Sequence, residues 1–331
     1  MIIVTLNEDR YAYDIHSLVK AFYPEQDVKV FAEGTKEEQS DAGMPAFFVI
    51  FKEEEICAGI TGKTQKTIRL GAPQDKSAVK NDLKQLLYGI LSEETGKTLP
   101  WGTLTGIRPT RLAMQLLEQG KTAEEADAYM RSTYLCSKEK TELAIDIAKR
   151  EKKILADIHY EEGYSLYVGI PFCPTTCLYC SFTSFPIRAW KDKVDAYLSA
   201  VEKEIDFVKE ACADKVLDSV YIGGGTPTTL EPDELDRLFA KLKGTLDWSQ
   251  VKEFTVEAGR ADSITAEKLR VMKKWGVTRI SVNPQTMKQE TLDVIGRRHT
   301  VEQTVEAFWT ARREGFDNIN MDLIMGLPGE D

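Results

Sequence analysis

The chain has 331 residues, of which 42% are hydrophobic, enough to bury one large core or two smaller ones. Its formal net charge of -10 argues against a general binder of nucleic acid or of anionic membranes. The first 20 residues carry no basic start followed by an apolar core, and the longest apolar run, residues 46–51, is far shorter than the roughly 20 residues that span a bilayer. We therefore expect a cytoplasmic protein whose partners include neither nucleic acid nor a membrane.

Residues 1–160 mix short strands with long helices and predict an α+β domain of unknown role. Residues 46–62 indicate a hairpin that turns at the glutamates 53–55, followed by a third strand near residues 67–70. A helical pattern begins at Ser77. Large apolar residues recur at helical spacing near the end of this domain, which predicts that they form a packing face: Leu143, Ile147, Ile154, Leu155 and Ile158.

Residues 161–331 alternate short β-branched runs with amphipathic helices. Strands are expected at 164–170, 218–224, 253–259, 279–284 and 318–326. Pro232 suits the first turn of one helix, and Thr300 with Gln303 forms a capping-box pattern at the start of another. This alternation predicts an α/β fold of parallel strands with right-handed crossovers, either an open doubly wound sheet or a barrel-like one. Both architectures bind ligands at the carboxyl ends of their strands.

Chemically versatile groups stand at the carboxyl ends of all five expected strands. Glu257 and Asp322 are charges in strands that should be nearly continuously apolar. The glycine-rich turn 223–226 follows the second strand, and Asn283 and Gln285 follow the fourth. A satisfied polar residue or a tight turn would explain any one of them. Their coincidence predicts a ligand-binding rim.

The loop after the first strand carries Cys173, Cys177 and Cys180 at spacing C-x-x-x-C-x-x-C. Cytoplasmic thiols stay reduced, so a metal or catalytic site is favoured over a disulfide. Three thiolates leave one position open on one corner of an iron-sulfur cube. A structural zinc ion would need a fourth ligand, which the local sequence does not offer and which Cys212 or His299 would have to supply. We favour an iron-sulfur cluster with one open iron, and zinc stays the alternative.

The sequence motifs around these residues are specific to one protein family. YVGIPFCPTTCLYCSF, GGGTPTTL, SVNPQT with IGRRH, and MDLIMGLPGE resemble, in order, the motifs of the oxygen-independent coproporphyrinogen III oxidase family of radical S-adenosylmethionine (SAM) enzymes. The likeness is greatest to the HemZ branch and runs from about residue 164 to the end of the chain. It implies a radical SAM partial (β/α)6-type barrel over residues 161–331, preceded by the smaller α+β domain.

The resemblance also implies the ligands. Cys173, Cys177 and Cys180 would ligate a 4Fe-4S cluster whose open iron is chelated by SAM. By motif match, five residues would hold SAM: Tyr167, Gly224, Gly225, Thr226 and Glu257. Three more match positions that contact a second SAM or line the same cavity: Gln285, Arg297 and Asp322.

The implied activity is the oxygen-independent oxidative decarboxylation of coproporphyrinogen III to protoporphyrinogen IX in heme synthesis. A deoxyadenosyl radical would abstract hydrogen from a propionate side chain, which loses carbon dioxide and an electron to become a vinyl group. An electron donor and an electron acceptor are then needed as partners. A tetracarboxylate porphyrinogen would favour cations near the rim, and the candidates are Arg188, Lys191, Arg260 and Arg298.

Three features depart from the pattern of the family. Phe182 stands where well-characterised oxidases have a further cysteine, and Gly169 where they have a histidine. The first departure is shared with a sister branch that acts as a heme-binding chaperone, so a chaperone that retains the cluster is the alternative function. The chain also stops directly after the fifth expected strand, which predicts a truncated version of a longer protein, without the sixth strand and the carboxy-terminal domain.

Overall fold

The computed structural model describes residues 1–32, 43–71 and 75–330. The chain divides into two compact units, Met1–Ile154 and Leu155–Asp331. Within the described ranges, no helix is both long enough and apolar enough to cross a membrane.

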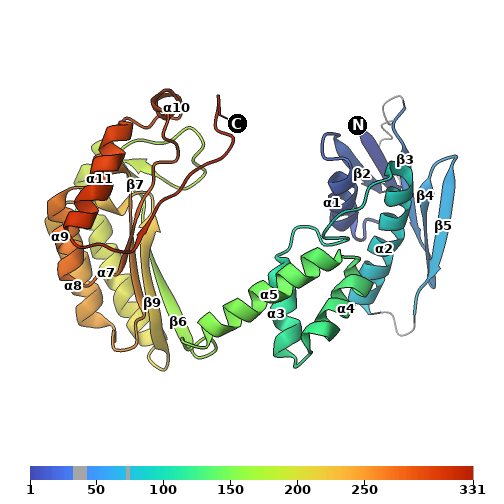
Figure 1. Cartoon of the computed structure of the whole chain (residues 1–331), viewed down its shortest axis with the longest axis horizontal. Helices are drawn as coiled ribbons and strands as arrows, with labels where there is room; N and C mark the ends of the chain where they lie inside the picture. Colours follow the sequence, from blue (N-terminus) through green and yellow to red (C-terminus); the bar gives the residue numbers. More distant parts are fainter. Residues whose placement is uncertain (33–42, 72–74, 331) are drawn as a thin grey trace. The chain divides into compact units, whose positions relative to one another are not determined.

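The first unit is built on a mixed five-stranded sheet. Its strands are β1 (Ile2–Leu6), β2 (Val28–Ala32), β3 (Ala46–Phe51), β4 (Glu55–Ile60) and β5 (Thr64–Arg69). Its helices are α1 (Ala12–Phe22), α2 (Lys76–Thr95), α3 (Pro109–Glu118), α4 (Ala123–Tyr134) and α5 (Lys138–Leu155). The strand order is β2-β1-β3-β4-β5, in which β1 pairs in parallel with β2 and β3 and the last three strands form an antiparallel meander (Figure 1).

The expected hairpin is confirmed, because β3 and β4 pair antiparallel on either side of residues 52–54. The third strand, β5, begins at Thr64, three residues before the expected start. The main core of this unit lies between the sheet and the helices α1 and α2, with Phe22, Phe47 and Leu83 among its fully buried side chains. Asp75 caps α2 by accepting a hydrogen bond from the backbone of Ala78.

The prediction for the packing face of α5 was wrong. Leu143 and Ile154 are 44% and 68% exposed, respectively. Apolar side chains occur on more than one side of this helix, so their spacing alone does not select the face that packs. The Thr141 hydroxyl donates a hydrogen bond to Asp127 of α4 and so turns the opposite face inward. The buried residues of α5 are Thr141, Ala144, Ile145 and Ala148.

The second unit alternates strands and helices as expected. Its strands are β6 (Gly163–Ile170), β7 (Phe172–Cys173), β8 (Phe185–Pro186), β9 (Val216–Gly224), β10 (Glu253–Gly259), β11 (Arg279–Val282) and β12 (Ile319–Asn320). Its α-helices are α6 (Ile187–Trp190), α7 (Val194–Ala211), α8 (Pro232–Thr245), α9 (Ala266–Lys274), α10 (Gln289–Val294) and α11 (Val301–Arg313). Short 3-10 helices lie between these elements, at Lys191–Lys193, Pro227–Thr229 and Ala261–Ser263.

The main sheet of this unit is parallel and runs in the order β12-β11-β10-β9-β6. The strands follow one another in chain order without a reversal, and α7, α8, α9 and α11 lie on the same side of them (Figure 1). This is the winding of a partial barrel, not of a doubly wound sheet. Over the described residues the sheet stays open, with β6 and β12 as its two edges.

Two details of this unit bear on the predictions. The expected fifth strand is shorter than its sequence indicates, because β12 covers two residues and Asp322 lies beyond its end. The helix signals are confirmed: Pro232 stands in the first turn of α8, and Thr300 and Gln303 form the capping box of α11. The apolar face of α8 is buried in the core of this unit, where Phe239 meets Phe254 of β10 edge to face.

Candidate functional site

The cysteine loop, residues 173–180, leaves the carboxyl end of β6. Cys173 is the last residue of β7, which pairs in parallel with β8, so that the chain returns to the start of the loop. The backbone of Phe185 donates to the carbonyl of Pro171 at 2.8 Å, and that of Cys180 donates to the carbonyl of Cys177 at 3.0 Å. All three thiols are free. The short pairing of β7 with β8 therefore brackets the loop, in which Cys173 is buried and Cys177 and Cys180 are half-buried.

The glycine turn after β9 packs directly against this loop. The amides of Gly225 and Thr226 donate to the carbonyls of Ile170 and Phe172, each at 2.7 Å. A Cβ on Gly225 would lie 2.6 Å from the carbonyl oxygen of Phe172 and 3.0 Å from the sulfur of Cys173. Only glycine permits this approach. The Thr226 hydroxyl also donates to the Cys173 sulfur at 3.5 Å.

Glu257, near the end of β10, is held by an aromatic neighbour on β9. The Tyr221 hydroxyl donates to Oε1 of Glu257 at 2.5 Å, and the ring of Tyr167 stacks on that of Tyr221 at 5.8 Å between centroids. Burial raises the pKa of Glu257, and the charge of Asp322 raises this pKa further, whereas the bond from Tyr221 lowers it. The carboxylate is thus desolvated and already oriented.

Gln285 joins the sheet to the cysteine loop. Its backbone has φ +65°, an uncommon left-handed conformation for a residue with a side chain. Its amide donates to the carbonyl of Asp322 at 2.9 Å, and its carbonyl accepts from Ile324 at the same distance. Its side-chain oxygen accepts from the hydroxyl of Tyr179, which lies between the last two cysteines, at 3.1 Å. Gln285 and Asp322 therefore meet at one rim.

Several buried polar atoms in β11 and in the segment after it lack a hydrogen-bond partner within the described part of the chain. The set comprises Oγ of Ser281, Oδ1 of Asn283, Nε of Arg297 and both ring nitrogens of His299. Burial, with the nearby charge of Arg297, lowers the pKa of His299 to about 4, so its ring is neutral at pH 7. Unpartnered buried polar atoms are costly, and a polar ligand at this place would satisfy some of them.

The three thiols of the cysteine loop are the donor set expected of an iron-sulfur cluster, and zinc would need a fourth ligand. Burial raises the pKa of the Cys173 thiol. Across the residues that the structure describes, no three metal-ligating side chains form a preformed metal site. Cys212, the distant candidate for a fourth zinc ligand, follows α7 and precedes β9, at the amino-terminal edge of the sheet. That edge is a full strand length away from the cysteine loop.

The structure corrects one candidate cation. Arg260 is 2% exposed, and its guanidinium is bonded to Thr175 and Asp262, so it is not free to bind a substrate carboxylate. Arg188, Lys191 and Arg298 are exposed.

Sequence reasoning also missed the role of Tyr221. The sequence did carry a signal for it. Side chains alternate along a strand, so Tyr221 lies on the same face of the strand as residue 223, the first of the glycine-rich turn.

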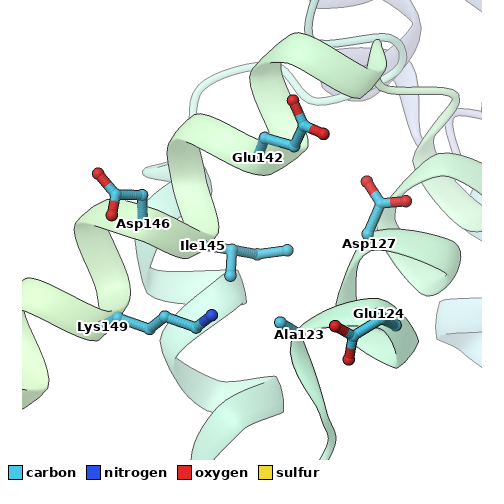
Figure 2. A pocket seen from close by; sticks show the side chains of 7 residues that line it. All are labelled: Ala123, Glu124, Asp127, Glu142, Ile145, Asp146 and Lys149. Carbon is cyan, nitrogen blue, oxygen red and sulfur yellow. The ribbon is translucent and has the colours of Figure 1, made fainter.

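The first unit has a separate pocket of about 340 Å³ between α4 and α5 (Figure 2). Its rim carries the carboxylates of Glu124, Asp127, Glu142 and Asp146. Asp127 already accepts from Thr141, and Asp146 pairs with Arg150 at 2.9 Å. These acidic side chains are solvated or paired, and they add no feature to the site on the second unit.

Comparison with known proteins identifies the fold of the second unit. The radical SAM superfamily matches residues 167–331, from Tyr167 through the cysteine loop and the whole rim. The chain carries a radical SAM domain. The expectation of an α/β radical SAM fold is therefore confirmed for this half of the chain.

Curated relatives extend the likeness. The oxygen-independent coproporphyrinogen-III oxidase-like protein HemZ of Bacillus subtilis strain 168 is 42% identical over 256 residues, which are 76% of this chain and 51% of HemZ. The heme chaperone HemW of the same organism is 40% identical over 167 residues, 50% of this chain and 43% of HemW. The chain thus spans about half the length of the curated relatives that it matches.

A solved structure, coproporphyrinogen III oxidase (HemN) from Escherichia coli, described as a radical SAM enzyme, is 30% identical. The match covers 54% of this chain and 41% of the HemN chain, with a TM-score of 0.47.

Proposed function

We propose that the radical SAM domain binds a 4Fe-4S cluster through Cys173, Cys177 and Cys180 and binds SAM beside it. The observation that carries this proposal is the docking of the glycine turn on the cysteine loop, with both amides of Gly225 and Thr226 bonded to the strand that leads into the loop. A nucleoside ligand lying along this turn would sit against the cluster. The donor set of three thiols leaves one iron for the ligand.

The rim residues then have distinct tasks. The absence of side chains on Gly224 and Gly225 lets the turn pack on Ile170 and Phe172 beside the cysteine loop, and Thr226 supports Cys173. The desolvated carboxylate of Glu257 accepts hydrogen bonds from a ribose hydroxyl or an ammonium group, and the exposed ring of Tyr167 covers the same face.

Gln285, Arg297 and Asp322 would line the far side of the cavity or contact a second SAM. Two contacts support their grouping. Gln285 is bonded to the backbone of Asp322, and Arg297 is 7% exposed and donates to the carbonyl of Asn283 at 2.6 Å.

When bound, the cluster and SAM supply the one-electron chemistry that begins hydrogen abstraction. We propose coproporphyrinogen III as the substrate, with loss of carbon dioxide from its propionates, an external electron donor and an external acceptor. The likeness to HemZ, an oxygen-independent coproporphyrinogen-III oxidase-like protein, supports this choice. Exposed Arg188 and Arg298 are suitable partners for the carboxylates of such a substrate.

A heme-binding chaperone is the second candidate. The 40% identity to HemW lies over half of the chain. Phe182, two residues after the last cysteine of the loop, is 73% exposed and offers an aromatic surface in place of a thiol. An exposed aromatic side chain suits contact with a flat macrocycle.

The first experiment asks whether the cluster forms. Iron, sulfide and electron paramagnetic resonance spectra are measured on the anaerobically reconstituted chain and on a Cys177→Ala variant, each with and without SAM. We expect about four irons in the wild-type chain, as the cluster requires, a spectrum that shifts with SAM, and loss of that spectrum in the variant. A folded wild-type chain that takes up no iron would contradict the proposal.

The second experiment separates the two functions. The loaded chain is given coproporphyrinogen III, SAM and a reductant, and vinyl products are measured by mass spectrometry; in parallel, it is titrated with heme. Vinyl product supports the decarboxylase. Stoichiometric heme binding without turnover supports the chaperone.

A further inference from the structure

Arg260, which directly follows β10, contacts Thr175 of the cysteine loop. The guanidinium Nη1 of Arg260 donates to the carbonyl of Thr175 at 3.1 Å and to its hydroxyl at 2.7 Å. The rest of the guanidinium faces Asp262, with Nε donating at 3.0 Å and Nη2 at 2.8 Å. Arg260 is 2% exposed, so this charge is buried and its hydrogen bonds are directed to these two partners.

Thr175 extends the contact to a third segment. Its hydroxyl donates to the carbonyl of Gly296 at 3.0 Å while it accepts from Arg260. The next turn of the loop is tied to the same segment, because Leu178 donates to the carbonyl of Ile295 at 3.0 Å. Thr175 therefore connects the loop to the residues after β10 and to those after α10.

The position of Thr175 in the loop links this contact to the cysteines. Thr175 lies midway between Cys173 and Cys177, so a shift of its backbone moves two of the three thiols relative to each other. Cys173 is fixed independently by β7 and by Thr226, whereas Cys177 is not in a strand or helix. The guanidinium fork of Arg260 pairs with Asp262, while its Nη1 donates to both the carbonyl and the hydroxyl of Thr175, and this restricts this part of the loop.

We propose that Arg260, oriented by Asp262, is a positioning residue that acts through Thr175 to restrain the cysteine loop between Cys173 and Cys177, and that this restraint helps the loop to hold the cluster. The proposal rests on the cluster assigned under the proposed function. It gives Arg260 a role at the metal centre in place of the substrate contact expected from the sequence.

Two variants test it, each with a matched control. Thr175→Val keeps the shape and removes the hydroxyl, and Thr175→Ser restores the hydroxyl. Arg260→Gln removes the fork, and Arg270→Gln removes an exposed arginine that pairs with Glu314 on the surface of the same unit. Circular dichroism melting identifies any variant that fails to fold.

Two readouts are measured on the whole chain. Amide hydrogen exchange of residues 175–180 is followed without the cluster, and the rate of iron loss to a chelator is followed with it. We expect faster exchange and about tenfold faster iron loss in Thr175→Val and Arg260→Gln, the effect of losing one such hydrogen-bonded contact. We expect values close to the wild type in the serine variant and in the surface control.

The two failures are distinguishable. Wild-type exchange of the loop in both Thr175→Val and Arg260→Gln would overturn the positioning role, while leaving the cluster proposal intact. Iron uptake absent from the folded wild type would overturn the proposed function itself, and with it the part of this inference that concerns the cluster. An equal loss in Thr175→Ser and Thr175→Val would also overturn the role assigned to the hydroxyl.

Discussion

The hydroxyl of Tyr221 lies 2.5 Å from Oε1 of Glu257, so that β9 and β10 share a hydrogen bond at the carboxyl end of the sheet. The ring of Tyr221 is stacked in turn on Tyr167 of β6. Three neighbouring strands therefore fix the position of one half-buried carboxylate, and this carboxylate is the proposed partner of SAM.

Removal of this donor should weaken SAM binding. In Tyr221→Phe the carboxylate keeps its charge but loses its orientation, and we expect SAM affinity to fall about fivefold to tenfold. Calorimetric titration of the anaerobically reconstituted protein measures this change. Tyr164→Phe, at the opposite end of β6, is the control. An unchanged affinity in Tyr221→Phe would contradict the role of the bond.

Glu257 should destabilise the folded protein when no ligand is bound. Its pKa in the folded protein is raised, chiefly by burial, above the ordinary value of 4.5. The folded state thus holds the proton more tightly than the unfolded state, and stability is lost as the pH rises from 4.5 through the folded pKa.

We therefore expect Glu257→Gln to melt at a higher temperature than the wild type at pH 7.5, with the difference shrinking toward pH 4, and to bind SAM more weakly. Thermal melts of both proteins across this pH range measure it. A variant that is less stable than the wild type at pH 7.5 would refute the argument.

Gly225 should tolerate no side chain. The Cβ of Gly225→Ala would enter the space between the carbonyl of Phe172 and the sulfur of Cys173, and we expect a loss of about 1–3 kcal/mol in the free energy of unfolding. Gly244→Ala in α8 is the control, because no atom lies within 4 Å of its added Cβ. That change should stabilise the protein by about 0.5–1 kcal/mol. Urea unfolding compares the two, and equal effects would contradict the packing described.

Asp218 should anchor the segment that enters the second unit. This residue is 3% exposed, and its carboxylate accepts from the backbone of His159 at 3.1 and 3.2 Å and lies 2.9 Å from Nδ1 of the ring. We expect Asp218→Ala to reduce the free energy of unfolding by about 1–3 kcal/mol.

Asp206→Ala, which breaks an exposed pair with Lys241, should cost less than about 1 kcal/mol. Chemical denaturation of both variants measures the contrast. If the two losses are alike, Asp218 does not have the anchoring role described.

The order of elements in the second unit was predictable because each signal is local. Alternation of strands and helices, the proline of α8 and the cap of α11 all lie within a few residues of the structures that they specify. The cysteine loop and the glycine turn were also readable, since thiols and glycines have few alternative uses in such a pattern.

The remaining features depend on tertiary contacts. Nothing in the sequence around Arg260 shows that its charge is buried against Thr175, 85 residues earlier. The inward face of α5 is set by a bond from Thr141 to another helix, and the short β12 reflects its pairing with β11 over two residues only. Local periodicity does not contain this information.

The hydrogen bonds from Gly225 and Thr226 to Ile170 and Phe172 have a thermodynamic consequence. These bonds join the glycine turn to the strands that lead into the cysteine loop. A ligand that orders one of the two segments therefore reduces the conformational entropy that the other segment loses when its own ligand binds. By linkage, the factor by which the metal centre tightens SAM binding equals the factor by which SAM tightens the binding of the metal centre. Protection of the cluster by SAM is therefore expected from the fold itself.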